Sequence, residues 1–166
     1  MEMKRIKVIN EPTELVPILR AVDTKIKREV FAEVSQRWCT MQDVENRFGE
    51  KGKEALMFFE QMKLVETKWE PTERGSEKAY HSYYMSFHIN TSCPVTEISD
   101  VLSVAVMPSA EFSKFEKRIL KLVGDEGKFA GDIAEELGIS PTMLKSLVKR
   151  SSALEYRGHR VEKYKT

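Results

Sequence analysis

Apolar residues at helical spacing predict two short helices, joined by a tight turn, within residues 129–150. They recur three to four positions apart in two runs, Ile133, Ala134 and Leu137, and then Leu144, Leu147 and Val148. Gly138 separates the runs, since glycine tolerates the backbone conformation that commonly ends a helix. Ser140 can cap the second helix, and Pro141 suits its first turn, where a missing N–H costs nothing. The pattern is therefore typical of a helix-turn-helix.

With its apolar residues turned inward, the second of these helices leaves a short polar and cationic outer face. The residues of this face are Thr142, Met143, Lys145, Ser146, Lys149 and Arg150. Such a face is a solvated helix surface in most proteins and a DNA-contacting surface in some. In the second case Thr142, Met143 and Ser146 would read bases, because they lie toward the helix N-terminus.

Segments on either side complete a small domain over residues 111–166. Upstream, one helix carries an apolar stripe and ends at a glycine; the stripe is Phe112, Phe115, Ile119, Leu122 and Val123. Downstream, residues 154–164 read as two short strands about Gly158. Three helices followed by a hairpin are typical of a winged helix.

Positive charge is concentrated at the end of the chain. Residues 141–166 carry seven basic and two acidic side chains, a formal charge of about +5, whereas the whole chain carries only +1. This segregation is typical of a phosphate-contacting surface. We therefore expect DNA binding by the second helix and the hairpin, with Arg157 and Arg160 on phosphates at the wing tip.

Residues 21–92 repeat the same architecture. A first amphipathic helix can be capped by Asp23 or Thr24. A second, short helix begins at Thr40, which forms an approximate capping box with Asp43, and stops at a glycine. A third helix, a strand, a turn that contains Pro and Gly, and an aromatic strand follow at residues 50–63, 64–69, 70–78 and 79–90.

The run from Asp23 to Tyr84 resembles the ArsR-type winged-helix transcriptional regulators, especially archaeal members. The resemblance rests on the helix DTKIKREVFAEV, the LVE that opens the wing and the RGSEKAYHSYY that closes it. It implies a dimeric DNA-binding regulator. The positions of that family's Ser-x-His-Leu signature hold Lys53, Glu54, Ala55 and Leu56. This third helix is also charge-balanced, so we expect the C-terminal winged helix to provide most of the DNA affinity.

An apolar helix between prolines is predicted for residues 93–110, which link the two domains. It packs either on its own domains or on its copy in a second chain. We favour the second arrangement, because two-fold pairing lets helix-turn-helix proteins span half-sites about 34 Å apart. The predicted dimerisation residues recur at i, i+3, i+4 and i+7: Ile98, Val101, Leu102 and Ala105.

The sequence lacks the usual catalytic and metal-binding motifs. Cys39 and Cys93 are far apart and form no CxxC site, so we expect two free thiols. The histidines are isolated and have no chelating neighbours in sequence. No phosphate-cradling glycine loop, GxSxG motif or nucleophile near a histidine occurs. We therefore expect no enzyme activity, no metal and no cofactor.

Length and composition indicate a cytoplasmic protein. The chain has 166 residues, of which 41% are hydrophobic, without a membrane-spanning stretch or an N-terminal signal region. The segment YHSYYMSFHI has aromatic or apolar residues on both faces. Either a dimer partner or a small hydrophobic effector would cover such a segment.

We predict a mainly α fold with small β wings (α+β), in which tandem winged helix-turn-helix domains are joined by an apolar linker helix. The domains are residues 1–92 and 111–166, and the linker is 93–110. The predicted function is a DNA-binding transcriptional regulator that acts as a homodimer on double-stranded DNA, without membrane contact. The alternative is a tandem winged-helix protein-interaction module of a transcription-related or scaffold complex. Salt-dependent affinity for random duplex DNA distinguishes the two.

Overall fold

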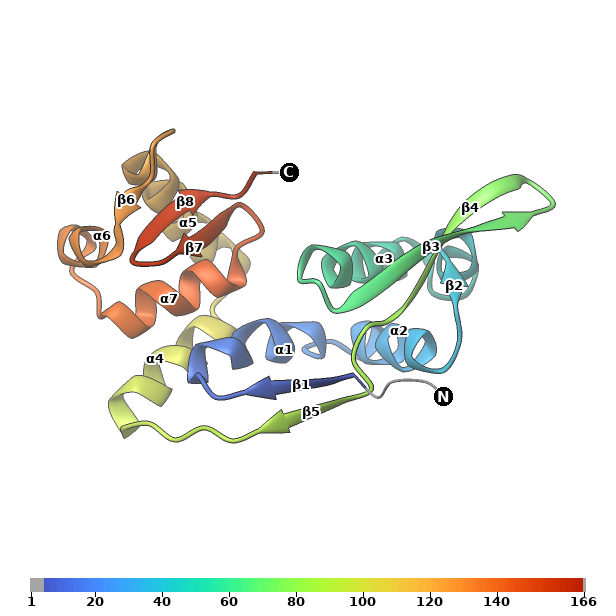
Figure 1. Ribbon diagram of the computed structural model, residues 1–166, viewed down its shortest axis with the longest axis horizontal. Helices are drawn as coiled ribbons and strands as arrows, with labels where there is room; N and C mark the ends of the chain where they lie inside the picture. Colours follow the sequence, from blue (N-terminus) through green and yellow to red (C-terminus); the bar gives the residue numbers. More distant parts are fainter. Residues whose placement is uncertain (1–4, 166) are drawn as a thin grey trace. The chain divides into compact units, whose positions relative to one another are not determined.

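The computed structural model describes residues 5–165 and consists of helices and small β-sheets (Figure 1). The structure is α+β, as predicted. Contacts between residues divide the described chain into two units. Unit N comprises residues 5–8 and 21–89, and unit C comprises residues 9–20 and 90–165. No helix within the described range is long and apolar enough to cross a membrane.

The first two helices of unit N begin at side-chain caps. α2 (Lys25–Gln36) follows Thr24, whose hydroxyl oxygen accepts a 3.2 Å hydrogen bond from a backbone N–H of the first turn. α3 (Met41–Gln61) follows Thr40, and the predicted capping box with Asp43 is present, with bonds of 3.0 and 3.1 Å. Both caps confirm the sequence prediction.

α3 contains the predicted second and third helices of unit N as two segments, residues 41–48 and 50–61. Gly49 divides them with φ +73° and ψ −160°, a conformation open mainly to glycine. Gly52 lies one turn further on and is buried. A Cβ atom at that position would overlap the Cβ of Phe48, and it would lie 3.2 Å from a methyl of Val44. The missing side chain therefore lets the two segments pack closely.

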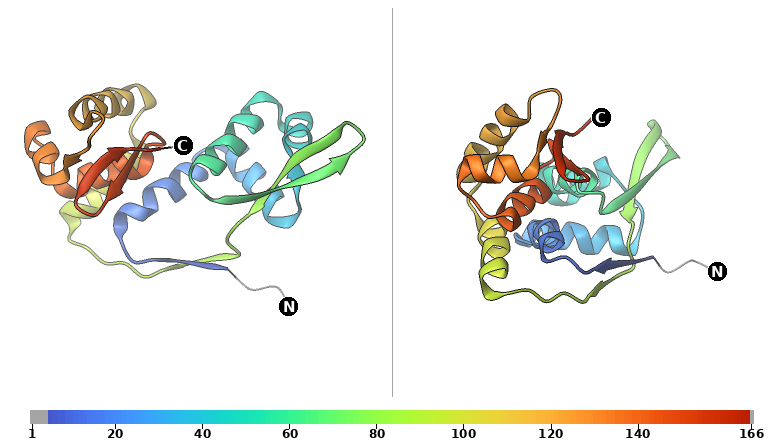
Figure 2. Two further views of the ribbon diagram at one scale, coloured as in Figure 1. Left: turned by 45° about the horizontal axis from the view of Figure 1, so that its top comes forward. Right: turned by 60° about the vertical axis from the view of Figure 1, so that its left-hand side comes forward.

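The wing of unit N is a longer hairpin than the sequence predicted. β3 (Val65–Thr72) and β4 (Gly75–Ser82) pair antiparallel along their whole length. The hairpin projects from the helices of unit N (Figures 1 and 2). β2 (Cys39–Thr40) pairs with the other edge of β4, which gives the order β2-β4-β3. The predicted turn over residues 70–78 is wrong, because the ladder continues to a two-residue turn.

The aromatic strand predicted over residues 79–90 is wrong, because these residues are divided between the end of β4 and a separate strand. β5 (Ser86–Ile89) instead pairs with β1 (Ile6–Ile9) in a separate two-stranded sheet. The Arg5 guanidinium lies 4.4 Å from the centre of the Tyr83 ring. The segment at β1, which we did not predict, thus covers part of the aromatic surface for which a dimer partner or an effector was expected.

Unit C also has three helices followed by a hairpin. The helices are α5 (Ser109–Val123), α6 (Ala130–Leu137) and α7 (Pro141–Arg150). A sheet of order β6-β8-β7 is formed by β6 (Lys128–Phe129), β7 (Leu154–Arg157) and β8 (Arg160–Lys163). Gly138 ends α6 in a left-handed conformation, with φ +67°, and Ser140 caps α7. The predicted helix-turn-helix is confirmed at both of these positions.

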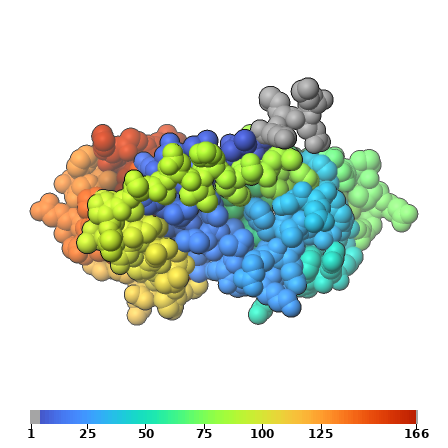
Figure 3. All heavy atoms as spheres, turned by 90° about the horizontal axis from the view of Figure 1, so that it is seen from below, coloured from blue at the N-terminus to red at the C-terminus, as the bar shows by residue number. Residues whose placement is uncertain are grey.

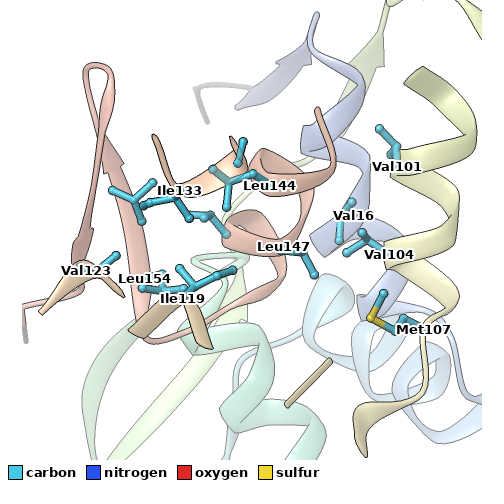
Figure 4. Close-up of a cluster of buried hydrophobic side chains, with 13 residues drawn as sticks. Val16, Val101, Val104, Met107, Ile119, Val123, Ile133, Leu144, Leu147 and Leu154 are labelled. Carbon is cyan, nitrogen blue, oxygen red and sulfur yellow. The ribbon is translucent and has the colours of Figure 1, made fainter. Parts of the chain in front are cut away.

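Three further elements belong to unit C: α4 (Val95–Val106), the 3-10 helix η1 (Pro12–Glu14) and most of α1 (Leu15–Ala21). The buried side chains of α4 point into the same core as those of α7, as Figure 4 shows for Val101 and Val104. We predicted a linker helix between two domains at residues 93–110. The contacts instead group α4 with unit C, because its apolar side is part of that core.

Candidate nucleic-acid interface

α7 is the helix that the sequence assigned to DNA, and its apolar side lies inward as predicted. Leu144, Leu147 and Val148 are at most 3% exposed. The Ser140 hydroxyl oxygen accepts a 3.0 Å hydrogen bond from the Met143 N–H, which fixes the start of the helix. The predicted bounds and apolar side of α7 are therefore correct. The structure differs from the prediction on the opposite, polar side of the helix.

Ser146 and Arg150 are buried, with 0% and 7% of their surface exposed. The prediction that they lie on an outer face is wrong. The reason is α4, which packs along α7 and places Val101 and Val104, both fully buried, against it (Figure 4). The Ser146 hydroxyl donates a 2.8 Å hydrogen bond to the carbonyl oxygen of Thr142 within α7. This hydroxyl is therefore satisfied without any contact to DNA.

The Arg150 guanidinium is held by main-chain oxygens at the end of α4. Its Nη1 lies 2.8 Å from the carbonyl oxygen of Val104 and 2.7 Å from that of Met107. The guanidinium also lies over the Phe112 ring, 4.4 Å from the ring centre. The last carbonyls of a helix lack partners within the helix and carry partial negative charge, which favours a cation there. Arg150 thus joins α7 to α4.

Carboxylates of unit C meet the polar residues at the start of α7. The Lys145 ammonium lies 2.7 Å from a carboxylate oxygen of Glu11, and the Thr142 hydroxyl lies 3.4 Å from one of Glu97. The hydroxyl that caps α7 also donates a 2.5 Å bond to Asp100. The hydrogen bond from Lys145 lowers the pKa of Glu11 below its usual value. Acidic side chains thus occupy the helix end where a recognition helix would read bases.

The other predicted DNA-contacting residues differ in exposure. Met143 and Lys149 are half-buried, whereas Arg157 and Arg160 are exposed on the β7–β8 hairpin. Arg157 pairs with two glutamates of that hairpin, at 3.2 and 3.3 Å. Arg160 donates a 3.3 Å hydrogen bond to a main-chain oxygen in the loop before β6. Both arginines therefore have partners within unit C.

The second segment of α3 presents an exposed face in unit N. Its buried residues, Ala55, Leu56 and Phe59, fix the segment on the core of that unit. Its exposed side chains follow one side of the helix: Glu50, Lys51, Glu54, Met57 and Gln61. This helix therefore keeps the kind of open face that α7 lacks.

The β3–β4 hairpin carries an exposed aromatic side chain and a balanced set of charges. Trp69 is 70% exposed. Lys68 and Arg74 form ion pairs with glutamates of the same hairpin, at 2.9 and 3.3 Å. Lys78 pairs with Glu60 of α3, and residues 65–82 hold four glutamates against three cations, so this wing has no surplus of positive charge for phosphates.

The residues predicted for dimerisation lie on different sides of α4. Val101 and Ala105 are buried in unit C, and Ile98 packs against the same core. Leu102 is 45% exposed, and it shares the outward side of α4 with two residues outside the predicted dimerisation set, Val95 at 82% and Val106 at 77%. α4 lies at the surface in yellow-green and yellow in the space-filling view (Figure 3).

The two cysteines are free thiols in different environments. Cys39 is fully buried and Cys93 is half-buried. Burial raises the pKa of the Cys39 thiol. Across residues 5–165, no group of three or more His, Cys, Asp or Glu side chains could hold a metal ion.

A hollow of about 490 Å³ is open to solvent in unit C. It is lined by Arg118, Lys121, Leu122, Glu136 and Leu137, which come from α5 and α6. This mixed lining differs from the aromatic surface at which the sequence indicated a small hydrophobic effector. An effector for this protein therefore stays a prediction.

A model of the family described as ArsR transcriptional regulator matches residues 9–165 of the chain. The match extends beyond the segment from Asp23 to Tyr84, on which the sequence resemblance rests, and spans α7 and its hairpin. Among proteins of curated function, no match was found.

Proposed function

The chain belongs to the ArsR family of transcriptional regulators, which bind DNA, and we propose that it reads DNA with residues 50–61, the second segment of α3. The contrast between the two third helices carries this proposal. In unit C, α4 and η1 pack on α7, whereas in unit N the second segment of α3 exposes side chains along one side. A helix needs such an exposed side to enter the major groove and reach base edges.

The exposed residues of α3 have side chains suited to base edges. A lysine such as Lys51 can donate to the O6 and N7 atoms of guanine, and a glutamate such as Glu54 can accept from the N4 amino group of cytosine. Met57 can pack on the methyl group of thymine. The helix predicted over residues 50–63 has no net charge, which led us to expect little DNA affinity from it. Base reading and phosphate attraction are, however, separate contributions, and only the second needs surplus positive charge.

We infer that both units are winged helices with different tasks. Each has three helices followed by an antiparallel hairpin. In unit C the polar side of the third helix is taken up by Arg150, by the acids that meet its start and by α4. Opening this contact to admit DNA would expose Val101 and Val104 and would break the Arg150 hydrogen bonds. In this proposal unit C does not read bases through α7, and base reading falls to unit N.

The homodimer is proposed to form through the outward side of α4. Val95, Leu102 and Val106 are large apolar side chains spaced at i, i+7 and i+11, so they lie on one side of the helix. Pairing with a second copy would bury all three while leaving the core of unit C intact. A two-fold dimer also suits a helix-turn-helix protein, because its operator half-sites are related by the same symmetry. Of the four residues predicted for dimerisation this interface keeps only Leu102, because Ile98, Val101 and Ala105 pack into unit C.

Operator selection followed by single substitutions tests the assignment to α3. Genomic fragments bound by the intact protein first define a preferred site. We then expect Lys51→Ala and Glu54→Ala to change the preference at individual base pairs, by about 1–3 kcal/mol each. Thr142→Ala and Met143→Ala are the matched controls on α7, and their base preferences should equal that of the parent protein. The opposite result would return base reading to α7, and a protein without salt-dependent DNA affinity would favour the interaction-module alternative.

A further inference from the structure

α5 carries four exposed cations along one side. Lys114, Lys117, Arg118 and Lys121 are spaced at i, i+3, i+4 and i+7 and are all exposed. We call them the α5 stripe. Within residues 5–165, no ion pair joins any of the four to a carboxylate. Other cations of unit C do have acidic partners, as in the pairs Lys128 with Glu136 and Lys163 with Asp125, at 2.9 and 3.2 Å.

The α5 stripe is unfavourable for the isolated helix. Lys114 and Arg118 are like charges at i,i+4, and so are Lys117 and Lys121. Like charges one helical turn apart repel each other and destabilise a helix. A bound polyanion would remove this repulsion. The apolar residues of α5, among them Ile119 and Val123, face the core of unit C, so the stripe itself contributes only charge and alkyl chains.

We propose that the α5 stripe is a second DNA-contacting surface, which binds phosphates beside the operator without reading sequence. This inference rests on the proposed DNA-binding function. From Lys114 to Lys121 the helix rises about 10 Å. One strand of B-DNA presents a phosphate about every 3.4 Å along its axis, so the stripe spans roughly three phosphates.

The composition of the stripe favours DNA over an acidic protein as the occupant. Three of its four members are lysines, which act as strongly hydrated point charges. Protein interfaces are depleted in lysine and enriched in aromatic residues at their centre. Phosphate contacts need no apolar anchor, and the α5 stripe offers none. Because phosphates are the same in every sequence, these contacts add affinity and position the protein without changing base preference.

The test uses the full-length protein and a labelled random-sequence duplex, titrated by fluorescence anisotropy over a series of NaCl concentrations. The variants are Lys117→Gln with Lys121→Gln, and Lys114→Gln with Arg118→Gln. Each should lower the slope of log K against log salt by about two per subunit, since each lost phosphate contact contributes about 0.9. Glutamine is a good helix former and the like-charge pairs are removed, so both variants should fold.

A variant with the same loss of charge gives the control. Lys25→Gln with Arg28→Gln removes two exposed cations from α2, and its slope should change by less than one. If both α5 variants keep the parental slope, or change it no more than this control, the α5 stripe does not bind DNA and an acidic protein becomes the better partner. Failure of the proposed function looks different, because the parent protein would then show no salt-dependent DNA binding at all. Selected operators should also keep their rank order of affinity in the α5 variants.

Discussion

Arg150, at the end of α7, donates a 2.8 Å hydrogen bond to the main-chain oxygen of Val104, in the last turn of α4. The sequence assigned this cation to DNA phosphate. In unit C it instead satisfies carbonyl groups that a helix end leaves without partners. The same positive charge that would attract a phosphate is favoured at the negative end of the α4 dipole. A cation at the end of a third helix is thus no evidence for DNA contact until its surroundings are known.

Replacing Arg150 should therefore lower stability more than DNA affinity. Arg150→Leu would leave buried carbonyl oxygens without donors, at a cost of about 2–4 kcal/mol in the free energy of unfolding. Arg150→Lys keeps the charge and N–H donors but loses the planar guanidinium that lies over the Phe112 ring, so its loss of stability should be intermediate. Urea denaturation followed by circular dichroism measures both. Lys149→Leu, at the half-buried neighbouring position, serves as the control and should cost less than 1 kcal/mol. Ordinary surface substitutions change the free energy of unfolding by up to about 0.5 kcal/mol. A change no larger than this in Arg150→Leu would contradict the structural role.

Helix caps and helix breaks were predictable from the sequence because they depend on neighbours in the chain. The capping box of Thr40 and Asp43 and the helix break at Gly138 need only the residues within one or two turns. The three-helix cores and the C-terminal hairpin followed from the same kind of local pattern, whereas the turn of the β3–β4 hairpin did not. The family could be identified for the same reason, since the motifs of residues 23–84 are continuous in sequence.

The partner of α4 could not be predicted from its own sequence pattern. Val101 and Ala105 mark an apolar side, but α7 of the same chain and a second copy would cover that side equally well. The pattern of α7 likewise indicated an exposed position for Ser146 and Arg150, because both are polar. Both can nevertheless be buried, since the Ser146 hydroxyl bonds within its own helix and the Arg150 guanidinium bonds to carbonyl oxygens. Which side of α7 stays exposed was decided by long-range packing. For that reason we propose α3, and not α7, as the reading helix.

The proposed dimer predicts a specific effect of charge on α4. Leu102→Glu with Val106→Glu would place like charges across the two-fold axis, and the dimer dissociation constant should rise about 100-fold or more. Because both positions are exposed, the monomer should keep its helix content. Multi-angle light scattering over a dilution series measures the change. Ser109→Glu with Ala110→Glu adds the same charge at the start of α5 and should remain dimeric. If the variant with Leu102→Glu and Val106→Glu remains dimeric, the interface lies elsewhere.

Gly52 is expected to be essential for the two segments of α3. In Gly52→Ala the new methyl group would overlap the Cβ of Phe48, so the segments must move apart. Overpacking of this kind costs about 1–3 kcal/mol and should also displace the proposed reading helix, with loss of sequence-specific DNA binding. Thermal unfolding and operator titration measure the two effects.

A second glycine in a helix provides the control for Gly52. A methyl group at Gly131 would meet only the ring of Phe129, which is 47% exposed and can turn away. Gly131→Ala should therefore be neutral or stabilising by up to about 1 kcal/mol, from the higher helix propensity of alanine. If both substitutions have the same effect on stability, the close packing at Gly52 is not the cause.

The two thiols should differ strongly in reactivity. The thiolate is the nucleophile, and Cys39 is fully buried with a raised pKa, so it needs both exposure and a higher pH to react. In the native protein, a disulfide reagent at pH 8 should modify Cys93 at least about 100-fold faster than Cys39, because Cys39 must wait for local opening.

The raised pKa of Cys39 also means that folding favours the neutral thiol. This contribution to stability is present at neutral pH and declines as pH rises above the pKa of the thiol in the unfolded chain, about 8.5. Cys93→Ser leaves one slow thiol, and Cys39→Ala leaves one fast thiol. In urea the two variants should react at equal rates, and a fast Cys39 in the native protein would show that β2 and its surroundings open more readily than the packing indicates.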